Sequence, residues 1–139
     1  MLDSIADTHT VIWYLYGDRR LSTVAKTFIE NTASKGHQIG LSSIILGEIV
    51  YVLDKKHEKH DPIPVDTFTR LQEALDASNR VLVEIPFDRR IAETMFRVDR
   101  AKIANPWDRM ITATALYFDL PLLCKDSAIR ASGIVRTIW

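Results

Sequence analysis

The stretch Asn105-Pro106-Trp107-Asp108-Arg109-Met110-Ile111-Thr112-Ala113-Thr114-Ala115-Leu116 predicts the start of a long helix with an acid in its first turn. Asn105 is a favourable N-cap and Pro106 suits the first helical position. Asp108 then lies among main-chain N–H groups that have no helical partner, where a carboxylate is stabilised. On this evidence alone Asp108 can be a simple capping acid. Three further acids stand at positions that are awkward for folding and useful for binding a cation: Asp7, Glu48 and Asp126.

The composition is that of one globular domain spanning residues 1–139. Hydrophobic residues make up 47% and charged residues 26% of the chain, which is ordinary for a protein with its own core. Lys plus Arg equals Asp plus Glu at 18 each, so the formal net charge is zero. This balance argues against a protein held on nucleic acid by bulk charge, but it is compatible with a local basic rim. A near-neutral surface is also typical of a chain that works with a partner.

The cysteine and the N-terminal segment indicate the compartment. Cys124 is the only cysteine and lies in an apolar run, so disulfides are excluded and a reducing cytoplasm is expected. Asp3 and Asp7 interrupt the apolar N-terminal segment, so no signal peptide is predicted. No run of about 18 apolar residues could span a membrane. We therefore expect a cytoplasmic protein.

Apolar periodicity predicts short strands that alternate with amphipathic helices. Residues Lys55 to Pro64 are polar and punctuated by proline, which predicts a surface loop in which His57 and His60 are weak metal candidates. The alternation favours an α/β fold with a mostly parallel sheet and right-handed crossovers. The expected strands are 2–6, 38–42, 81–85, 121–124 and 134–138, and the expected helices are 8–16, 22–34, 43–54, 65–77, 88–103, 106–119 and 127–131.

Glu48 is predicted to lie on the apolar face of its helix. Ile44 and Ile45 precede it and Tyr51 and Val52 follow it at helical spacing. Burying an unpaired carboxylate is costly, and no cationic residue shares this face. Glu48 therefore favours a cation-binding site over a structural ion pair.

The four acids can meet at one edge of the sheet. Asp7 and Asp126 each follow a strand end, where functional groups of parallel sheets gather, although Asp7 can also be a helix cap. Four clustered carboxylates would repel one another without a cation. Ligation by oxygen alone favours Mg²⁺ or Mn²⁺ over zinc. Such an ion, with no covalent nucleophile in sight, suits hydrolysis of a phosphodiester.

The motifs around these acids resemble the successive motifs of PIN domains, and most of all the toxins of VapBC toxin–antitoxin systems. The resemblance covers nearly the whole chain, in order. The four motifs are Asp7-Thr8-His9, Glu48 within Leu41-Ser42-Ser43-Ile44-Ile45-Leu46-Gly47-Glu48-Ile49, Pro106-Trp107-Asp108-Arg109, and Leu122-Leu123-Cys124-Lys125-Asp126.

The resemblance implies a three-layer α/β/α fold with a parallel sheet of four or five strands. It also implies an Mg²⁺- or Mn²⁺-dependent ribonuclease that acts on RNA, forms a homodimer and is neutralised by a small antitoxin. Relatives often carry Asp where this chain has Asn105, so help from a fifth acid is missing. The site implied consists of the catalytic and metal-binding acids Asp7, Glu48, Asp108 and Asp126, the candidate phosphate contacts Arg109 and Lys125, and the supporting positions Thr8 and Asn105.

Apolar side chains on two helices are candidates for the partner surfaces. Together they offer more apolar surface than one small sheet needs to cover, so we expect part of it at a dimer interface or beneath an antitoxin segment. The alternative, that all of them are core, stays open. They are Trp13, Tyr14, Tyr16, Tyr51 and Val52.

Two other functions compete with the ribonuclease. A phosphoacceptor signalling domain also clusters acids above a parallel sheet. It would need an acid at the end of the central strand, but Val81 to Ile85 is followed by Pro86-Phe87, and it would have no use for Glu48 on an apolar face. A non-catalytic PIN-like binding module is disfavoured only because all four acids are kept.

Overall fold

Five parallel strands form the centre of the computed structural model, which describes residues 1–55 and 62–139. The order across the sheet is β3-β2-β1-β4-β5, and every neighbouring pair is parallel. The α/β fold with a parallel sheet is therefore confirmed, while the predicted loop histidines His57 and His60 lie outside the described residues. The strands are β1 Leu2–Ala6, β2 Gln38–Ser42, β3 Leu82–Ile85, β4 Leu122–Leu123 and β5 Thr137–Ile138.

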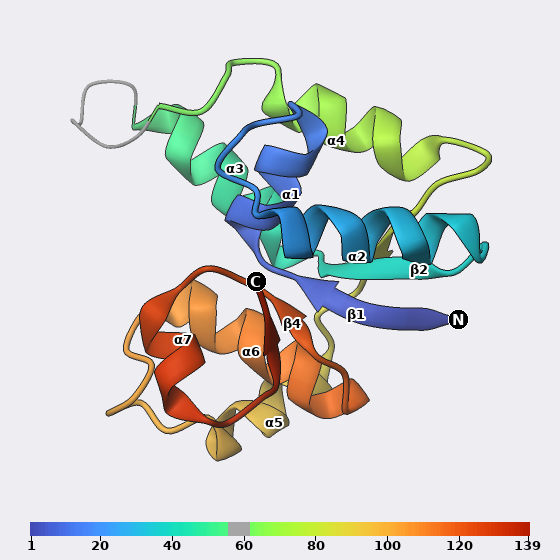
Figure 1. Cartoon of the computed structure of the whole chain (residues 1–139). Coiled ribbons are helices and arrows are strands. Elements are labelled where there is room, and N and C mark those ends of the chain that lie inside the picture. The colour runs from blue at the N-terminus through green and yellow to red at the C-terminus, as the bar shows by residue number, and fades with distance from the viewer. Residues whose placement is uncertain (56–61) are drawn as a thin grey trace.

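Helices cover both faces of this sheet, so the fold has three layers with the sheet in the middle. The chain runs from β1 through β2 to β3 in one direction and then returns to the other side of β1, so right-handed crossovers place the early and late helices on opposite faces. In Figure 1 the first four helices lie above the sheet and α5, α6 and α7 lie below it. The upper group is α1 Thr8–Leu15, α2 Thr23–Ser34, α3 Ile44–Asp54 and α4 Thr67–Asp76, and the lower group is α5 Arg89–Thr94, the short 3₁₀ helix η1 Met95–Arg97, α6 Pro106–Phe118 and α7 Ser127–Ser132.

The core lies against the three central strands. Ile5 of β1, Leu41 of β2 and Leu122 of β4 are completely buried. Gly40 of β2 is required by this packing, because a Cβ atom there would lie 2.3 Å from Cδ1 of Ile85 and 2.9 Å from Cδ1 of Ile5. The tight centre fixes the position of β1 and β4, whose ends carry two of the acids.

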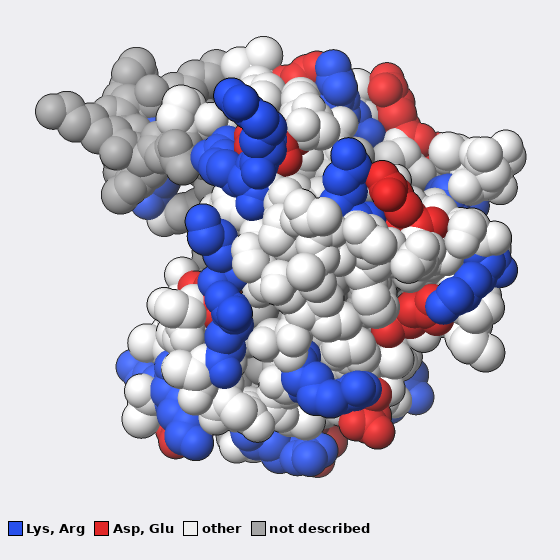
Figure 2. All heavy atoms as spheres, in the orientation of Figure 1, with Lys and Arg blue, Asp and Glu red and all other residues white. Residues whose placement is uncertain are grey.

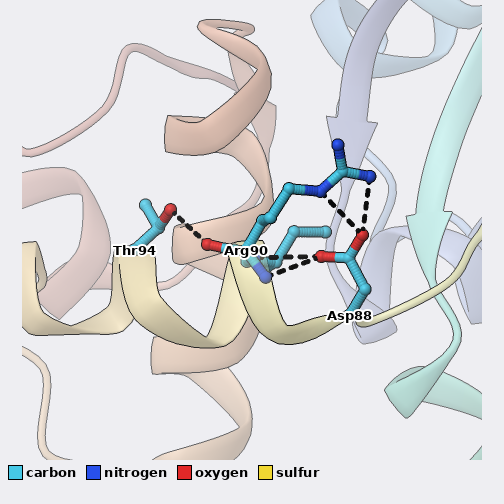
Figure 3. Close-up of polar contacts among 4 residues, drawn as sticks. Asp88, Arg90 and Thr94 are labelled. Atoms are coloured by element: carbon cyan, nitrogen blue, oxygen red, sulfur yellow. Dashed lines mark hydrogen bonds and ion pairs between the residues drawn. The ribbon is translucent and has the colours of Figure 1, made fainter.

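The predicted helix 88–103 is wrong beyond Thr94. Asp88 caps α5: its Oδ1 accepts hydrogen bonds from two main-chain N–H groups and its Oδ2 accepts two from the Arg90 side chain (Figure 3). The chain then tightens into η1 and becomes extended at Val98. The Arg109 side chain of α6 donates to the carbonyls of Met95 and Val98, which stabilises the break. Apolar spacing alone could not show this because the stabilising partner comes from another helix.

Three smaller predictions also need correction. The last strand is limited to β5, because Gly133 ends α7 with φ of +66° and Ile134 N–H donates to the Ser132 hydroxyl. Tyr51 is 48% exposed, since the buried face of α3 runs through Ile45 and Ile49. Trp13, one of five candidates of which only part was expected at a partner surface, is 7% exposed and belongs to the core. No helix within the described residues is long and apolar enough to cross a membrane.

Candidate active site at the switch point of the sheet

The site lies where the strand order reverses, between the carboxyl ends of β1 and β4. The main-chain N–H of Asp7 donates to the Leu123 carbonyl at 3.1 Å, and the buried Thr10 hydroxyl donates to the same carbonyl at 2.9 Å. The start of α1 is thereby fixed to the end of β4, three residues before Asp126.

Asp7 and Asp126 are both helix N-caps. Oδ1 of Asp7 accepts from Thr10 N–H at 2.9 Å, and Oδ1 of Asp126 accepts from Ile129 N–H at 2.9 Å. Asp7 is only 5% exposed, and this burial, with a smaller contribution from the Asp126 charge, raises the pKa of its carboxyl. Each of the two carboxylates therefore uses Oδ1 to cap its helix, and a hydrogen bond from the Thr10 side chain to Asp7 partly opposes the rise of the Asp7 pKa.

Glu48 projects toward α1 from the second turn of α3. The Thr8 hydroxyl donates a short hydrogen bond to Oε2 of Glu48, which confirms contact between the first and second motifs. Partial burial raises the pKa of Glu48 and the Asp7 charge adds to the rise, while the Thr8 hydrogen bond and His9 oppose it. A supporting role of Thr8 in the site stays a prediction.

Asp108 carries the clearest electrostatic signature. Oδ1 of Asn105 accepts from Asp108 N–H at 3.2 Å, so Asn105 is the predicted N-cap and Pro106 is the first residue of α6. Burial raises the pKa of Asp108 from 3.8 to about 7, followed by the negative charges of the other three acids. Asp108 therefore lies within electrostatic range of the other three carboxylates.

The carboxylate oxygens of this cluster are suitable ligands for a hard divalent cation, although they are too far apart to surround one as they stand. Among residues 1–55 and 62–139, no three His, Cys, Asp or Glu side chains stand close enough together to hold a metal ion. Asp7 and Asp126 each cap a helix through one oxygen, and Asp108 accepts no side-chain hydrogen bond within the described residues. An ion would have to draw the carboxylates inward, and oxygen ligands of this kind suit Mg²⁺ or Mn²⁺.

The two candidate phosphate contacts differ. The half-buried Arg109 donates three hydrogen bonds, at 3.0 to 3.3 Å, to the carbonyls of Met95 and Val98, so its guanidinium holds the η1 turn. A phosphate contact by Arg109 stays a prediction that would require these bonds to change. Lys125 is exposed beside Asp126, and its Nζ lies 5.8 Å from the centre of the Trp13 ring.

His9 is a residue that sequence reasoning passed over. It is exposed on α1, its ring lies 5.4 Å from that of Trp13, and its charge lowers the pKa of both Asp7 and Glu48. The available signal was its place one residue after Thr8 in the first motif. The aromatic pair of His9 and Trp13 therefore lies at the edge of the acidic cluster.

The family profile of the PIN domain matches residues 5–133, which include all four acids. This chain belongs to the PIN domain family. A comparison with curated proteins found no significant match. Membership of this family argues against the alternative of a phosphoacceptor signalling domain.

Several solved structures share the fold over nearly the whole chain. A chain of VapBC2 from Rickettsia felis, bound to a promoter DNA fragment, gives a TM-score of 0.67 at 17% identity and covers 99% of this chain and 97% of that one. DNA-bound VapBC from Salmonella typhimurium gives 0.67 at 19% identity, with coverage of 99% and 97%. A toxin–antitoxin complex from Klebsiella pneumoniae gives 0.61 at 23% identity, with coverage of 95% and 94%. These likenesses confirm the three-layer fold of this PIN domain.

Proposed function

We propose that this PIN domain is an Mg²⁺- or Mn²⁺-dependent ribonuclease and the toxin of a toxin–antitoxin pair. The observation that supports this most is the position of Asp108, a carboxyl whose pKa is raised to about 7 first by burial and then by the charges of Asp126, Glu48 and Asp7. In the part of the chain that the structure describes, no ion pair involves any of the four. An acidic cluster of this kind destabilises the fold unless a cation neutralises it.

The residues divide the work of the proposed reaction. Asp7 and Asp126 use one oxygen to cap a helix and present the other to the cation, while Thr8 orients Glu48. Asp108 gives up the proton that its raised pKa retains near neutral pH. When bound, the ion would polarise a phosphoryl oxygen and lower the pKa of the attacking water. The Lys125 ammonium would hold a neighbouring phosphate.

The proposed partners are an antitoxin and a second copy of the chain. One solved neighbour, from Klebsiella pneumoniae, is a toxin–antitoxin complex. Val50 and Tyr51 of α3 remain 43% and 48% exposed and offer an apolar contact. Light scattering should show a dimer, and a clean monomer across micromolar concentrations would argue against it.

Cleavage of a mixed RNA pool tests the function. Metal-loaded protein should cleave single-stranded or looped RNA, and EDTA-treated protein should not. Asp7→Asn and Asp108→Asn should remove activity while the circular-dichroism spectrum is kept, because each change removes a charge at nearly constant volume. Identical cleavage with and without EDTA would refute the metal mechanism. Absence of metal-dependent cleavage across varied RNAs would favour a non-catalytic binding module.

A further inference from the structure

A small pocket opens on the outer side of α1, next to the acidic cluster. Its volume is about 200 Å³, below the roughly 300–1,000 Å³ of sites for drug-sized ligands. A space of this size suits one planar ring system. Its walls are formed by His9, Trp13, Tyr16 and Arg20, with Ile63 and Pro64 facing them.

The pocket is built from stacked flat groups. Trp13 forms its buried base, with the His9 ring at 5.4 Å and the Arg20 guanidinium at 5.1 Å from the indole. Asp18 fixes that guanidinium through two side-chain hydrogen bonds, at 3.1 Å to Nε and 2.8 Å to the terminal nitrogen. Aromatic rings and guanidinium planes are the surfaces on which proteins stack unpaired bases of RNA.

The charges connect the pocket to the cluster of acids. Lys125 precedes Asp126 in the chain, and its ammonium lies over the Trp13 ring that forms the base of the pocket. His9 lies in the pocket wall and close enough to Asp7 and Glu48 to affect both carboxyls. Figure 2 shows Lys and Arg side chains along the hollow at the left edge, between the upper helices and the lower helices. Positive charge beside a stacking surface matches a strand that carries a phosphate next to each base.

We infer that this pocket receives one unpaired base of the RNA, adjacent to the phosphate held at the acidic cluster. The inference rests on the proposed ribonuclease function and adds to it a base-reading position. The base stacks against His9 and the Trp13–Arg20 pair, and Lys125 contacts the phosphate between the pocket and the acids. The pocket thereby determines which phosphodiester bond of the RNA reaches the acidic cluster.

Binding in EDTA, without cleavage, tests the inference. Wild type is titrated with short single-stranded RNA oligomers of each base and with an abasic ribose–phosphate oligomer of equal length, and binding is followed by tryptophan fluorescence and by anisotropy of a labelled oligomer. At least one base-bearing oligomer should bind about tenfold more tightly than the abasic one, since a stacked base contributes about 1–3 kcal/mol. Because both oligomers carry the same number of phosphates, the ratio of their affinities removes the contribution of general electrostatic attraction.

Three variants and a control locate the effect. His9→Ala and Arg20→Gln should each reduce the ratio several-fold, while Arg136→Gln, a change at the β5 side of the sheet, should keep it. Trp13→Phe should retain most of the affinity but lose most of the quenching of tryptophan fluorescence by bound RNA, because the remaining Trp107 and Trp139 do not line the pocket. Circular dichroism confirms that each variant is folded.

The outcomes separate this inference from the proposed function. A wild-type ratio near one, or a ratio unchanged in both His9→Ala and Arg20→Gln, overturns the base pocket, and a pocket that instead takes a protein side chain gives the same result. Cleavage by the metal-loaded wild type then still supports the ribonuclease. Failure of wild type to cleave any RNA with metal overturns the ribonuclease, whatever the binding ratio is.

Discussion

Replacing Asp108 with Asn should stabilise the metal-free protein, although it removes a residue of the proposed site. The pKa of Asp108 rises from 3.8 to about 7 in the folded protein, first through burial and then through Asp126, Glu48 and Asp7. Ionised Asp108 is therefore less favourable in the folded state than in the unfolded state. Asn keeps the volume and removes the charge.

The sign and the pH window follow from linkage. An acid whose pKa is higher in the folded state makes the fold progressively less stable as pH rises from the unfolded value of 3.8 to the folded value near 7. The full effect would be about 4 kcal/mol at about 1.36 kcal/mol for each pH unit. Because Asp108 is partly exposed, solvent screens much of it, and we expect about 2 kcal/mol. This corresponds to a melting temperature higher by roughly 5–10 °C.

Urea denaturation in EDTA at about pH 4 and about pH 8 measures the difference between variant and wild type. The Asp108→Asn variant should match wild type near pH 4 and exceed it near pH 8. Asp99→Asn is the matched control, because Asp99 is exposed and Asn can keep its hydrogen bond to Ala101 N–H. A variant less stable than wild type at pH 8, or a difference independent of pH, would refute the electrostatic reasoning.

Three further changes test separate parts of the molecule. Glu48→Gln should raise the melting temperature of the metal-free protein by relieving carboxylate repulsion and should remove most of the gain with Mn²⁺, which for wild type is about 2.7 kcal/mol at a hundredfold the Kd. Arg109→Ala should lower the free energy of unfolding by about 1–3 kcal/mol in urea, since the carbonyls of Met95 and Val98 lose the hydrogen bonds from the guanidinium. Gly40→Ala should cost about 1–3 kcal/mol in the same assay, because the new methyl group meets Ile85.

Each of these changes has an opposite outcome that would be informative. A lower melting temperature for Glu48→Gln with an intact Mn²⁺ response would take Glu48 out of the site. Unchanged stability of Arg109→Ala would mean that water replaces the guanidinium and that Arg109 is available for phosphate. Unchanged stability of Gly40→Ala would mean that the facing side chains move aside without loss of packing.

The sequence predicted the fold well because its signals are local. Alternating apolar segments and helix-start residues place all five strands and the start of α6, and the handedness of crossovers then leaves little freedom in the layers. The break after α5 could not be predicted in this way, since Arg109 stabilises it from a segment eleven residues or more away in the chain. The sequence also left open which of the five apolar candidates are core, because this depends on the helix faces that pack against them: Trp13 is buried and Tyr51 is exposed.

The candidate acids were harder to judge from sequence because capping and cation binding use the same residues in the same places. Asp7 and Asp126 are N-caps, and Asp108 stands in the first turn of a helix. Capping needs one oxygen of a carboxylate or of an amide, whereas binding a cation needs the charge. Asn therefore separates the two roles at Asp7 and Asp126, because it can keep the hydrogen bond to the helix while it removes the charge, and Ala removes both. If Asn and Ala at Asp126 abolish cleavage equally but only Ala lowers stability, the charge serves the reaction and the oxygen serves the fold.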